Sequence, residues 1–210
     1  MKKRLLFYTS IVCVIGILTQ SCEKDDKELK PEFSLEQPDQ ISDEIYDIYS
    51  LVINERFSSE KIVIAQATTT GTDLNYEMYP LDDLIKNHQD FDSSLVQIHN
   101  DLNENSVNFG EQFHSDTKEI ILISSDEISY IFDSQDLNGL IGDWEEFHKD
   151  YENSNGIIHF SRIALNADNT QAIFKISSSY GYLNGGTSIV FLENIEDNWT
   201  ILEVILAWVS

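Results

Sequence analysis

The stretch GIIHFSRIALNADNTQAIFKISSSYGYLNGGTSIVFLENIEDNWTILEVILAW, residues 156–208, decides the fold. Its apolar and β-branched residues gather in four runs, at 157–165, 171–177, 188–193 and 199–208. Such runs favour strands, and the Asn-, Asp- and Gly-rich segments between them are typical of turns. The sequence therefore predicts a four-strand antiparallel meander at the C-terminal end of the chain.

Upstream of this stretch the apolar residues follow helical spacing. The clearest helix is predicted to begin with Ser42 as its cap, with Ile45, Ile48, Tyr49 and Val52 on one face. Residues 80–102 form a second helical region that is interrupted near residue 90. Two helices or one broken helix fit that region equally well.

Two further helices and two further strands are expected before the meander. Helices are predicted to begin at Ser125 and Asp143, the second with Trp144, Phe147 and Tyr151 on one stripe that suits a core. Strands are predicted at 61–70 and 119–124, and the second is too continuously apolar for an exposed edge. The whole predicts an α+β fold in which N-terminal helices pack over one face of an antiparallel sheet.

The first 21 residues have the character of a secretory signal peptide. Met1 to Arg4 is cationic, and the run from Leu5 to Leu18 is almost entirely apolar. The run is shorter than the roughly 20 residues that a membrane-spanning helix needs. Residues 1–21 are therefore expected to be removed from the mature protein.

The segment Thr19-Gln20-Ser21-Cys22 resembles the lipobox of bacterial lipoproteins, although Thr19 stands where that family usually has Leu. The resemblance implies that Cys22 is acylated, for example with palmitate, and becomes the first residue of a membrane-anchored protein. Two or more acyl chains hold a protein firmly to a bilayer, whereas one binds marginally. The alternative is that Cys22 is a free thiol left by ordinary cleavage.

Residues 23–26, Glu-Lys-Asp-Asp, are similar to the short signal that sends some lipoproteins to the outer face of the outer membrane. The alternative is that they simply begin a charged linker. An outer membrane lipoprotein is expected in either case, facing the periplasm or the exterior. Residues 22–40 then form a lipidated cysteine and a flexible acidic tether with Pro31 and Pro38, and residues 41–210 form a single α+β domain.

Charge and cysteine content exclude several functions. The chain has 13 Lys and Arg against 37 Asp and Glu, a formal net charge of −24. Such an acidic surface repels nucleic acids and favours cations, basic proteins or neutral ligands as partners. The alternative is that the charge serves solubility alone. Cys13 leaves with the signal peptide and Cys22 is committed to lipid. The mature body therefore lacks disulfides, Cys-based metal sites and Cys nucleophiles.

A second resemblance covers about the last 70 residues. The spaced aromatics Trp144, Phe147 and Tyr151, the turn residues Ser154 and Gly156, and then a set of turn and core positions are similar to an uncharacterised family of exported bacterial proteins. That set is Ser161-Arg162-Ile163, Asn166, Gln171-Ala172, Gly181, Gly185-Gly186, Leu192 and Trp199. Glu152 stands where the family has proline. The resemblance implies this fold and no particular activity.

The five histidines do not form a metal motif. His88, His99, His114, His148 and His159 include no pair at a spacing of three or four residues, so no zinc ligand set is assigned. His159 and Ser161 share a face of a predicted strand, which suggests a hydrolase pair. The G-x-S-x-G turn that exposes a nucleophilic serine is missing, so structural roles are expected instead.

The densest group of carboxylates lies in the predicted helix that begins at Asp143. Its members are Asp143, Glu145, Glu146, His148 and Asp150. Paired carboxylates can hydrolyse glycosides or bind metal, but the helical spacing also fits a solvated face opposite the aromatic stripe. The segments Asp90-Phe91-Asp92 and Asp168-Asn169 lack a calcium-loop register and fit tight turns. Gly185-Gly186 lacks the context of a phosphate loop.

The sequence therefore assigns no catalytic, cofactor or metal residue, and one lipid-attachment residue, Cys22. It favours a membrane-anchored lipoprotein of the bacterial envelope with a non-catalytic binding or structural domain. One alternative is an acidic immunity or inhibitor protein that blocks a basic toxin or nuclease. The other is an envelope hydrolase that uses the carboxylates of residues 143–150.

Overall fold

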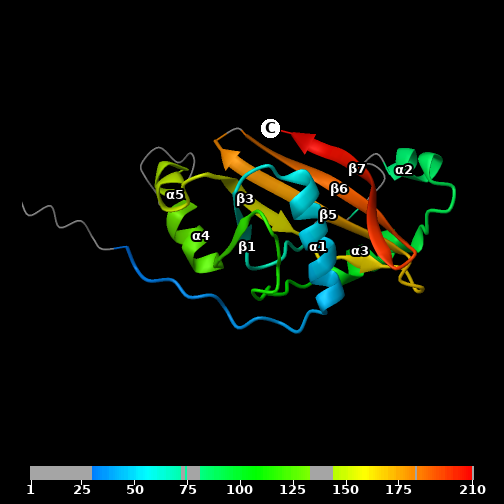
Figure 1. Ribbon diagram of the computed structural model, residues 1–210, viewed down its shortest axis with the longest axis horizontal. Coiled ribbons are helices and arrows are strands. Elements are labelled where there is room, and N and C mark those ends of the chain that lie inside the picture. The colour runs from blue at the N-terminus through cyan, green and yellow to red at the C-terminus, as the bar shows by residue number, and fades with distance from the viewer. Residues whose placement is uncertain (1–29, 72–73, 75–80, 133–143, 183, 210) are drawn as a thin grey trace, which may run out of the picture. The chain divides into compact units, whose positions relative to one another are not determined.

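A mixed β-sheet forms the centre of the structure, a computed structural model shown in Figure 1. The structure describes residues 30–71, 74, 81–132, 144–182 and 184–209, so the predicted signal peptide and Cys22 lie outside the described residues. Its strands are β1 (Lys61–Ala65), β2 (Glu119–Ile123), β3 (Ser154–Phe160), β4 (Ala164–Leu165), β5 (Gln171–Gly181), β6 (Asn184–Ile195) and β7 (Asn198–Val209). They lie in the order β2-β1-β3-β5-β6-β7, and β4 pairs with β5.

The C-terminal half of the sheet confirms the predicted meander and the α+β class. Strands β3, β5, β6 and β7 are successive antiparallel neighbours. The run 157–165 is not one strand, because the chain leaves β3 after Phe160 and returns as the short β4. Strands β5 and β6 are longer than expected and meet in a tight hairpin in which Gly181 pairs with Asn184.

The other half of the sheet is parallel, which the sequence pattern did not indicate. Strand β1 pairs in parallel with β2 on one side and with β3 on the other. Strand β2 is the last strand of the sheet, so the expectation that it could not be an edge was wrong. Its residues from Ile120 to Leu122 are only half-buried, and its apolar character does not require a neighbour on both sides.

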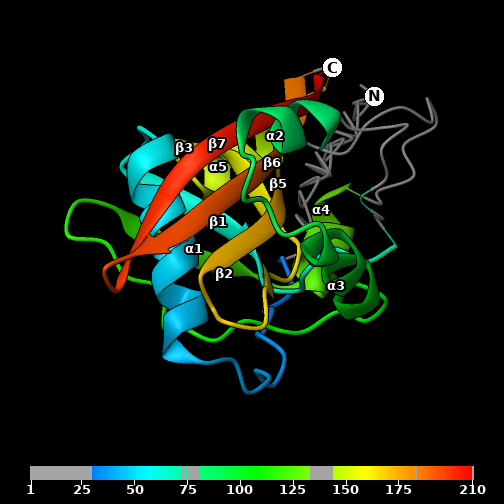
Figure 2. The same ribbon diagram turned by 90° about the vertical axis from the view of Figure 1, so that its right-hand side faces the viewer.

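Helices cover both faces of the sheet, whereas the sequence led us to expect helices on one face (Figure 2). They are α1 (Asp43–Arg56), α2 (Leu81–Asn87), α3 (Ser94–Leu102), α4 (Ser125–Phe132) and α5 (Trp144–Asp150). The broken helical region is thus two helices, α2 and α3. Helix α1 packs on one face, and the α2–α3 and α4–α5 pairs pack on the other. The reason is that β1, β3 and β5 bury consecutive residues, so both faces need cover.

Aromatic side chains fill the core beneath α1. Tyr49 is 1% exposed, and its ring lies 4.7 Å from that of Phe160 and 5.3 Å from that of Phe174. Ser42 stands at the N-cap of α1 as expected. Its side chain makes no capping bond, however, and its backbone carbonyl accepts hydrogen bonds from Ile45 and Tyr46. On the other face the α5 stripe is buried, as its spacing indicated.

The compact unit begins at Phe33, earlier than the boundary at residue 41 that composition suggested. Glu36 is held by Gln66 at the end of β1, because its N–H donates to the Gln66 amide oxygen (2.7 Å) and its carbonyl accepts from the Gln66 amide nitrogen (2.8 Å). The Asp39 N–H donates to the Asn108 carbonyl at 2.9 Å. Residues 33–40 are therefore part of the folded body rather than of a tether. Among the described helices, none combines the length and apolarity that a bilayer crossing requires.

Candidate functional site

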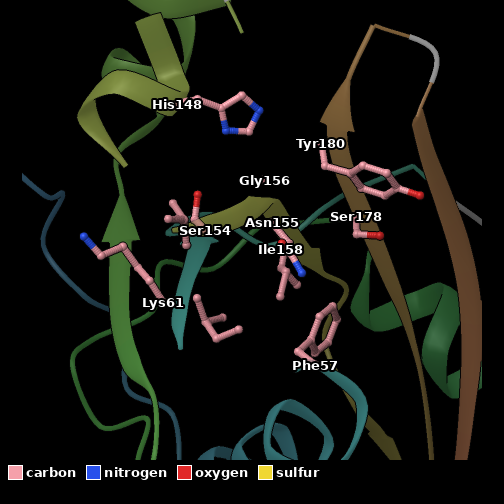
Figure 3. A pocket seen from close by; sticks show the side chains of 11 residues that line it. Phe57, Lys61, His148, Ser154, Asn155, Gly156, Ile158, Ser178 and Tyr180 are labelled. Atoms are coloured by element: carbon pink, nitrogen blue, oxygen red, sulfur yellow. The ribbon is translucent and has the colours of Figure 1, made fainter. Parts of the chain in front are cut away.

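A pocket of about 470 Å³ opens at the C-terminal end of α1 (Figure 3). Phe57 at the end of α1 forms one wall, and the first residues of β1 and β3 supply Lys61 and Asn155. Tyr180 at the end of β5 stands across from them. Figure 3 shows His148 of α5 above this opening, with its ring directed toward the other labelled side chains. Five elements from three separate parts of the sequence thus meet around one concavity.

A second depression of about 240 Å³ adjoins the pocket and shares Phe57, Ser178 and Tyr180 with it. It continues over the ends of β5, β6 and β7, where Val204 and Leu206 line it. We refer to the pocket and this depression together as the α1 groove.

The α1 groove exists because α1 is shorter than the strands beneath it. A helix of 14 residues spans about 21 Å, whereas the 12 residues of β6 span about 40 Å. The helix begins over the start of β7, where the Trp199 indole donates to the Glu44 carboxylate at 3.2 Å. Its last turn lines the depression together with Val204, and none of the described helices covers the strand ends beyond that residue on this face.

Gly156 permits the close approach of β3 to β5 at the floor of the groove. Its φ of 101° lies in the range that favours glycine. A Cβ at this position would lie 2.0 Å from the Ser179 carbonyl oxygen and 2.6 Å from the Tyr180 Cα. Glycine is therefore required here both by conformation and by space.

The polar groups of the pocket are held by the surrounding backbone and rings. The Ser154 hydroxyl donates to the Tyr151 carbonyl at 2.8 Å, so it is engaged at the end of α5. The His148 ring lies 5.7 Å from the Trp144 ring and 5.4 Å from the Phe147 ring, and its side chain is exposed. Lys61 forms an ion pair of 3.7 Å with Glu119, whose side chain is 64% exposed. An ion pair this open to solvent is weak and exchangeable.

The electrostatic character of the groove is opposite to that of the chain. Arg56, Lys61 and His148 line it, and no Asp or Glu is found among its described lining residues. In a chain with 37 Asp and Glu, such a stretch of surface is unexpected. The Arg56 guanidinium has no ion-pair partner in the described part of the chain. The groove therefore presents hydrogen-bond donors and positive charge to a ligand.

The serine that the sequence paired with His159 is bound by a different histidine. The His99 ring of α3 lies 3.0 Å from the Ser161 hydroxyl, which also accepts from the Lys175 backbone N–H at 2.7 Å. His99 and Ser161 are both fully buried. A substrate cannot reach a hydroxyl enclosed in this way, so the Ser161–His99 pair is structural. His159 is itself mostly buried, and this burial lowers its pKa.

The carboxylates of α5 do not converge on the groove. Glu146 pairs with Lys149 at 3.4 Å on the helix surface, and Glu145 and Asp150 are exposed. Asp143 lies outside the described residues. His148 is the one member of this sequence cluster that lines the pocket. The condition that would favour a hydrolase, with Glu146, His148 and His159 in one cleft, is not met.

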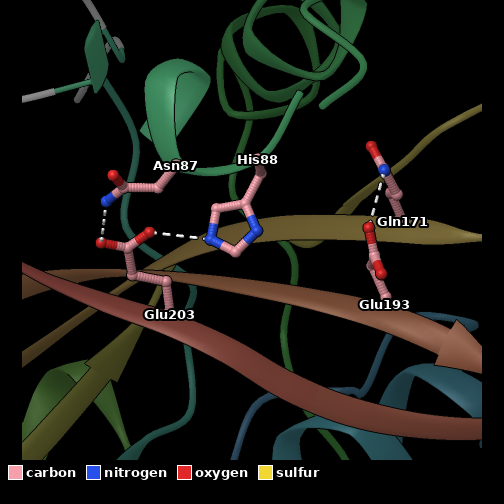
Figure 4. Close-up of polar contacts among 5 residues, drawn as sticks. All are labelled: Asn87, His88, Gln171, Glu193 and Glu203. Carbon is pink, nitrogen blue, oxygen red and sulfur yellow. Dashed lines mark hydrogen bonds and ion pairs between the residues drawn. The ribbon is translucent and has the colours of Figure 1, made fainter. Parts of the chain in front are cut away.

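The remaining polar motifs hold α2 and its following loop on the sheet (Figure 4). The His88 ring nitrogen lies 2.9 Å from the Glu203 carboxylate of β7, and Asn87 donates to the same carboxylate at 3.3 Å. Gln171 donates to Glu193 at 3.1 Å and to the Asp90 carbonyl at 2.9 Å. These contacts belong to a docking surface between elements.

The segments considered for calcium are tight turns, as their spacing indicated. The Asp92 carboxylate accepts from the Ser94 N–H at 2.9 Å, and hydrogen bonds from Ser94 lower its pKa. The Asn166 amide oxygen accepts from the N–H groups of Thr170 and Gln171, which closes the turn around Asp168. Within the described residues, no three His, Cys, Asp or Glu side chains gather as metal ligands.

Another concave region lies near the carboxyl end of β1, with a volume of about 610 Å³. Glu36 and Glu111 line it, and its central amide, Gln66, is already bonded to Glu36 on both of its polar atoms. Its central amide is therefore occupied by the chain itself, and its charged lining residues are acidic. The α1 groove is the better candidate for a ligand.

Comparisons with known proteins identify no family for this chain. No protein-family model, no curated protein and no solved structure matches the chain.

Proposed function

We propose that this protein is a lipid-anchored, non-catalytic binding protein of the bacterial cell envelope, and that the α1 groove is its ligand site. The observation that carries the proposal is the charge of the groove. Arg56, Lys61 and His148 line it without a described carboxylate, in a chain whose formal net charge is −24. Grooves with convergent polar groups over an apolar floor are the usual form of small-ligand sites.

The ligand of this site is anionic. Lys61 and Arg56 supply charged donors, and the Asn155 amide and Ser178 hydroxyl add neutral hydrogen-bonding groups. A cation would meet repulsion in the groove although the chain as a whole attracts cations. The engaged Ser154 hydroxyl and the exposed His148 ring supply no pair of nucleophile and base, which favours binding over catalysis.

Envelope attachment is supported by the cationic start, the apolar run and the lipobox resemblance at Cys22. Attachment through lipid would hold the domain beside a membrane without a spanning helix.

The binding proposal can be tested by NMR on the isotope-labelled chain carrying Cys22→Ala, titrated with acetate, phosphate and sulfate. We expect shift changes that concentrate at His148, Asn155 and Ser178. The Lys61→Gln variant should reduce them, whereas Lys86→Gln, which makes the same change in net charge on α2, should not. Shift changes that scatter over the surface, or that Lys61→Gln and Lys86→Gln reduce equally, would reject the groove as the site.

A further inference from the structure

The two halves of the α1 groove differ in chemistry. The pocket near His148 combines the polar side chains of Lys61, His148 and Asn155 with apolar ones, whereas more of the lining of the adjoining depression is aliphatic and includes Val52, Ile176, Val190 and Val204. Val52 and Val190 are fully buried and support this floor from beneath, so the aliphatic surface open to a ligand is that of Val204 and Leu206. Arg56 lies in the last turn of α1 and lines the depression beside this floor.

The apolar half opens onto an exposed apolar rim. Leu206 and Val209 line the depression and are 61% and 59% exposed. Trp208 is also exposed, but it pairs with Thr187 on the other face of the sheet and does not line the depression. The register brings Val209 opposite Gly186 and Trp208 opposite Thr187, so the rim lies at the hairpin end of the sheet. Large apolar side chains exposed together in this way mark a surface that contacts an apolar molecule.

We infer that the α1 groove takes one amphipathic ligand, an anionic head group that carries a single apolar chain, as in a fatty acid. The inference rests on the proposed function, because it uses the same groove. The head group binds at the end that holds Lys61 and His148. The apolar chain of the ligand lies over Val204 and Leu206 toward Val209, and Arg56 stands on the α1 side of it.

Charge complementarity and shape both select this class of ligand. A small anion leaves the aliphatic surface uncovered, and an uncharged chain forms no ion pair with the cations of the groove. The depression, at about 240 Å³, is smaller than the pocket of about 470 Å³, which suits one apolar chain rather than two. An anchor at Cys22 would keep such a groove close to membrane lipids.

Affinity should depend on chain length in a way that a simple anion site does not show. Each methylene buried from water contributes about 0.8 kcal/mol, which is about a fourfold gain in affinity. The series butyrate, hexanoate, octanoate, dodecanoate should therefore bind progressively more tightly. The gain per methylene should fall away once the depression is filled.

The test is calorimetric titration of the chain carrying Cys22→Ala with this series and with dodecanol, all below their micelle concentrations. Dodecanoate should bind at least tenfold more tightly than butyrate and than dodecanol. Lys61→Gln, which removes a cation at the head-group end, should weaken dodecanoate severalfold and leave dodecanol unchanged. Leu206→Gln should flatten the dependence on chain length. Ile195→Gln, at an exposed aliphatic position near the opposite end of the β6–β7 pair, should not.

The outcomes separate the two proposals. Equal affinity for butyrate and dodecanoate would overturn the amphipathic ligand and leave the anion site standing. Equal affinity for dodecanol and dodecanoate would show that the cations of the groove take no part in binding. It would overturn both the anion site and the amphipathic ligand. If Leu206→Gln and Ile195→Gln weaken dodecanoate binding equally, the apolar chain of the ligand lies outside the groove and the inference is overturned.

Discussion

The Tyr49 hydroxyl on α1 donates a hydrogen bond of 2.7 Å to the backbone carbonyl of Ser161, at the bend between β3 and β4. The two residues are 112 positions apart, and this contact fixes α1 on the sheet. Burial raises the pKa of Tyr49, so the hydroxyl stays protonated and remains a donor. The position of α1, and therefore of the α1 groove, depends in part on this bond.

We expect Tyr49→Phe to lower the free energy of unfolding by about 1 to 3 kcal/mol, because it leaves the buried Ser161 carbonyl without this donor. Urea denaturation measures the change as a lower midpoint with an unchanged slope. Tyr130→Phe is the control, since Tyr130 is 44% exposed and should change stability by less than about 0.5 kcal/mol. Equal stability of Tyr49→Phe and the wild type would show that this bond does not hold α1.

Gly156→Ala should destabilise the fold strongly. The new Cβ meets the Ser179 carbonyl, and the positive φ is unfavourable for alanine, so we expect a loss of about 3 kcal/mol or more. Gly71→Ala separates the two causes. Gly71 also has a positive φ, of 63°, but a Cβ there would find nothing within 4 Å, so a loss of about 1 kcal/mol is expected. Similar losses of stability in Gly156→Ala and Gly71→Ala would contradict the close approach of β3 to β5 at Gly156.

His159 should make stability depend on pH. Burial lowers its pKa in the folded state, whereas the unfolded chain titrates near 6.5. Below about pH 6.5 the unfolded state therefore binds more protons, and the free energy of unfolding falls as pH drops toward the folded pKa. The contribution is at most about 1.4 kcal/mol per pH unit. His159→Gln should reduce the difference in urea midpoint between about pH 7.5 and about pH 5.5, and an unchanged difference would contradict the assignment.

Local features of the fold could be read from the sequence. The spacing of Ile45, Ile48, Tyr49 and Val52 predicted α1, and the alternation of strand-forming runs with Asn- and Gly-rich turns predicted the meander. Both depend on neighbours within a few residues. The parallel pairing of β1 with β2 and β3 could not be read in the same way. Those partners lie more than 50 positions apart, and parallel pairing leaves no turn signal between them.

The candidate site was hidden for a related reason. Its residues come from seven elements, and the groove exists only because α1 ends at Arg56 while β5, β6 and β7 continue. The Ser161–His99 pair likewise joins residues 62 positions apart. One signal was present in the sequence. Between residues 153 and 192, Asp168 is the only carboxylate in an otherwise acidic chain, and this stretch supplies much of the groove.

Envelope location, and the access of the α1 groove to membrane lipids, both depend on Cys22. Mass spectrometry of the N-terminal peptide of the protein, purified from its own membranes, tests this directly. A peptide that begins at Cys22 and carries the mass of a thioether-linked glyceryl lipid is the expected result. A chain that begins at Met1, or an unmodified Cys22, would contradict it.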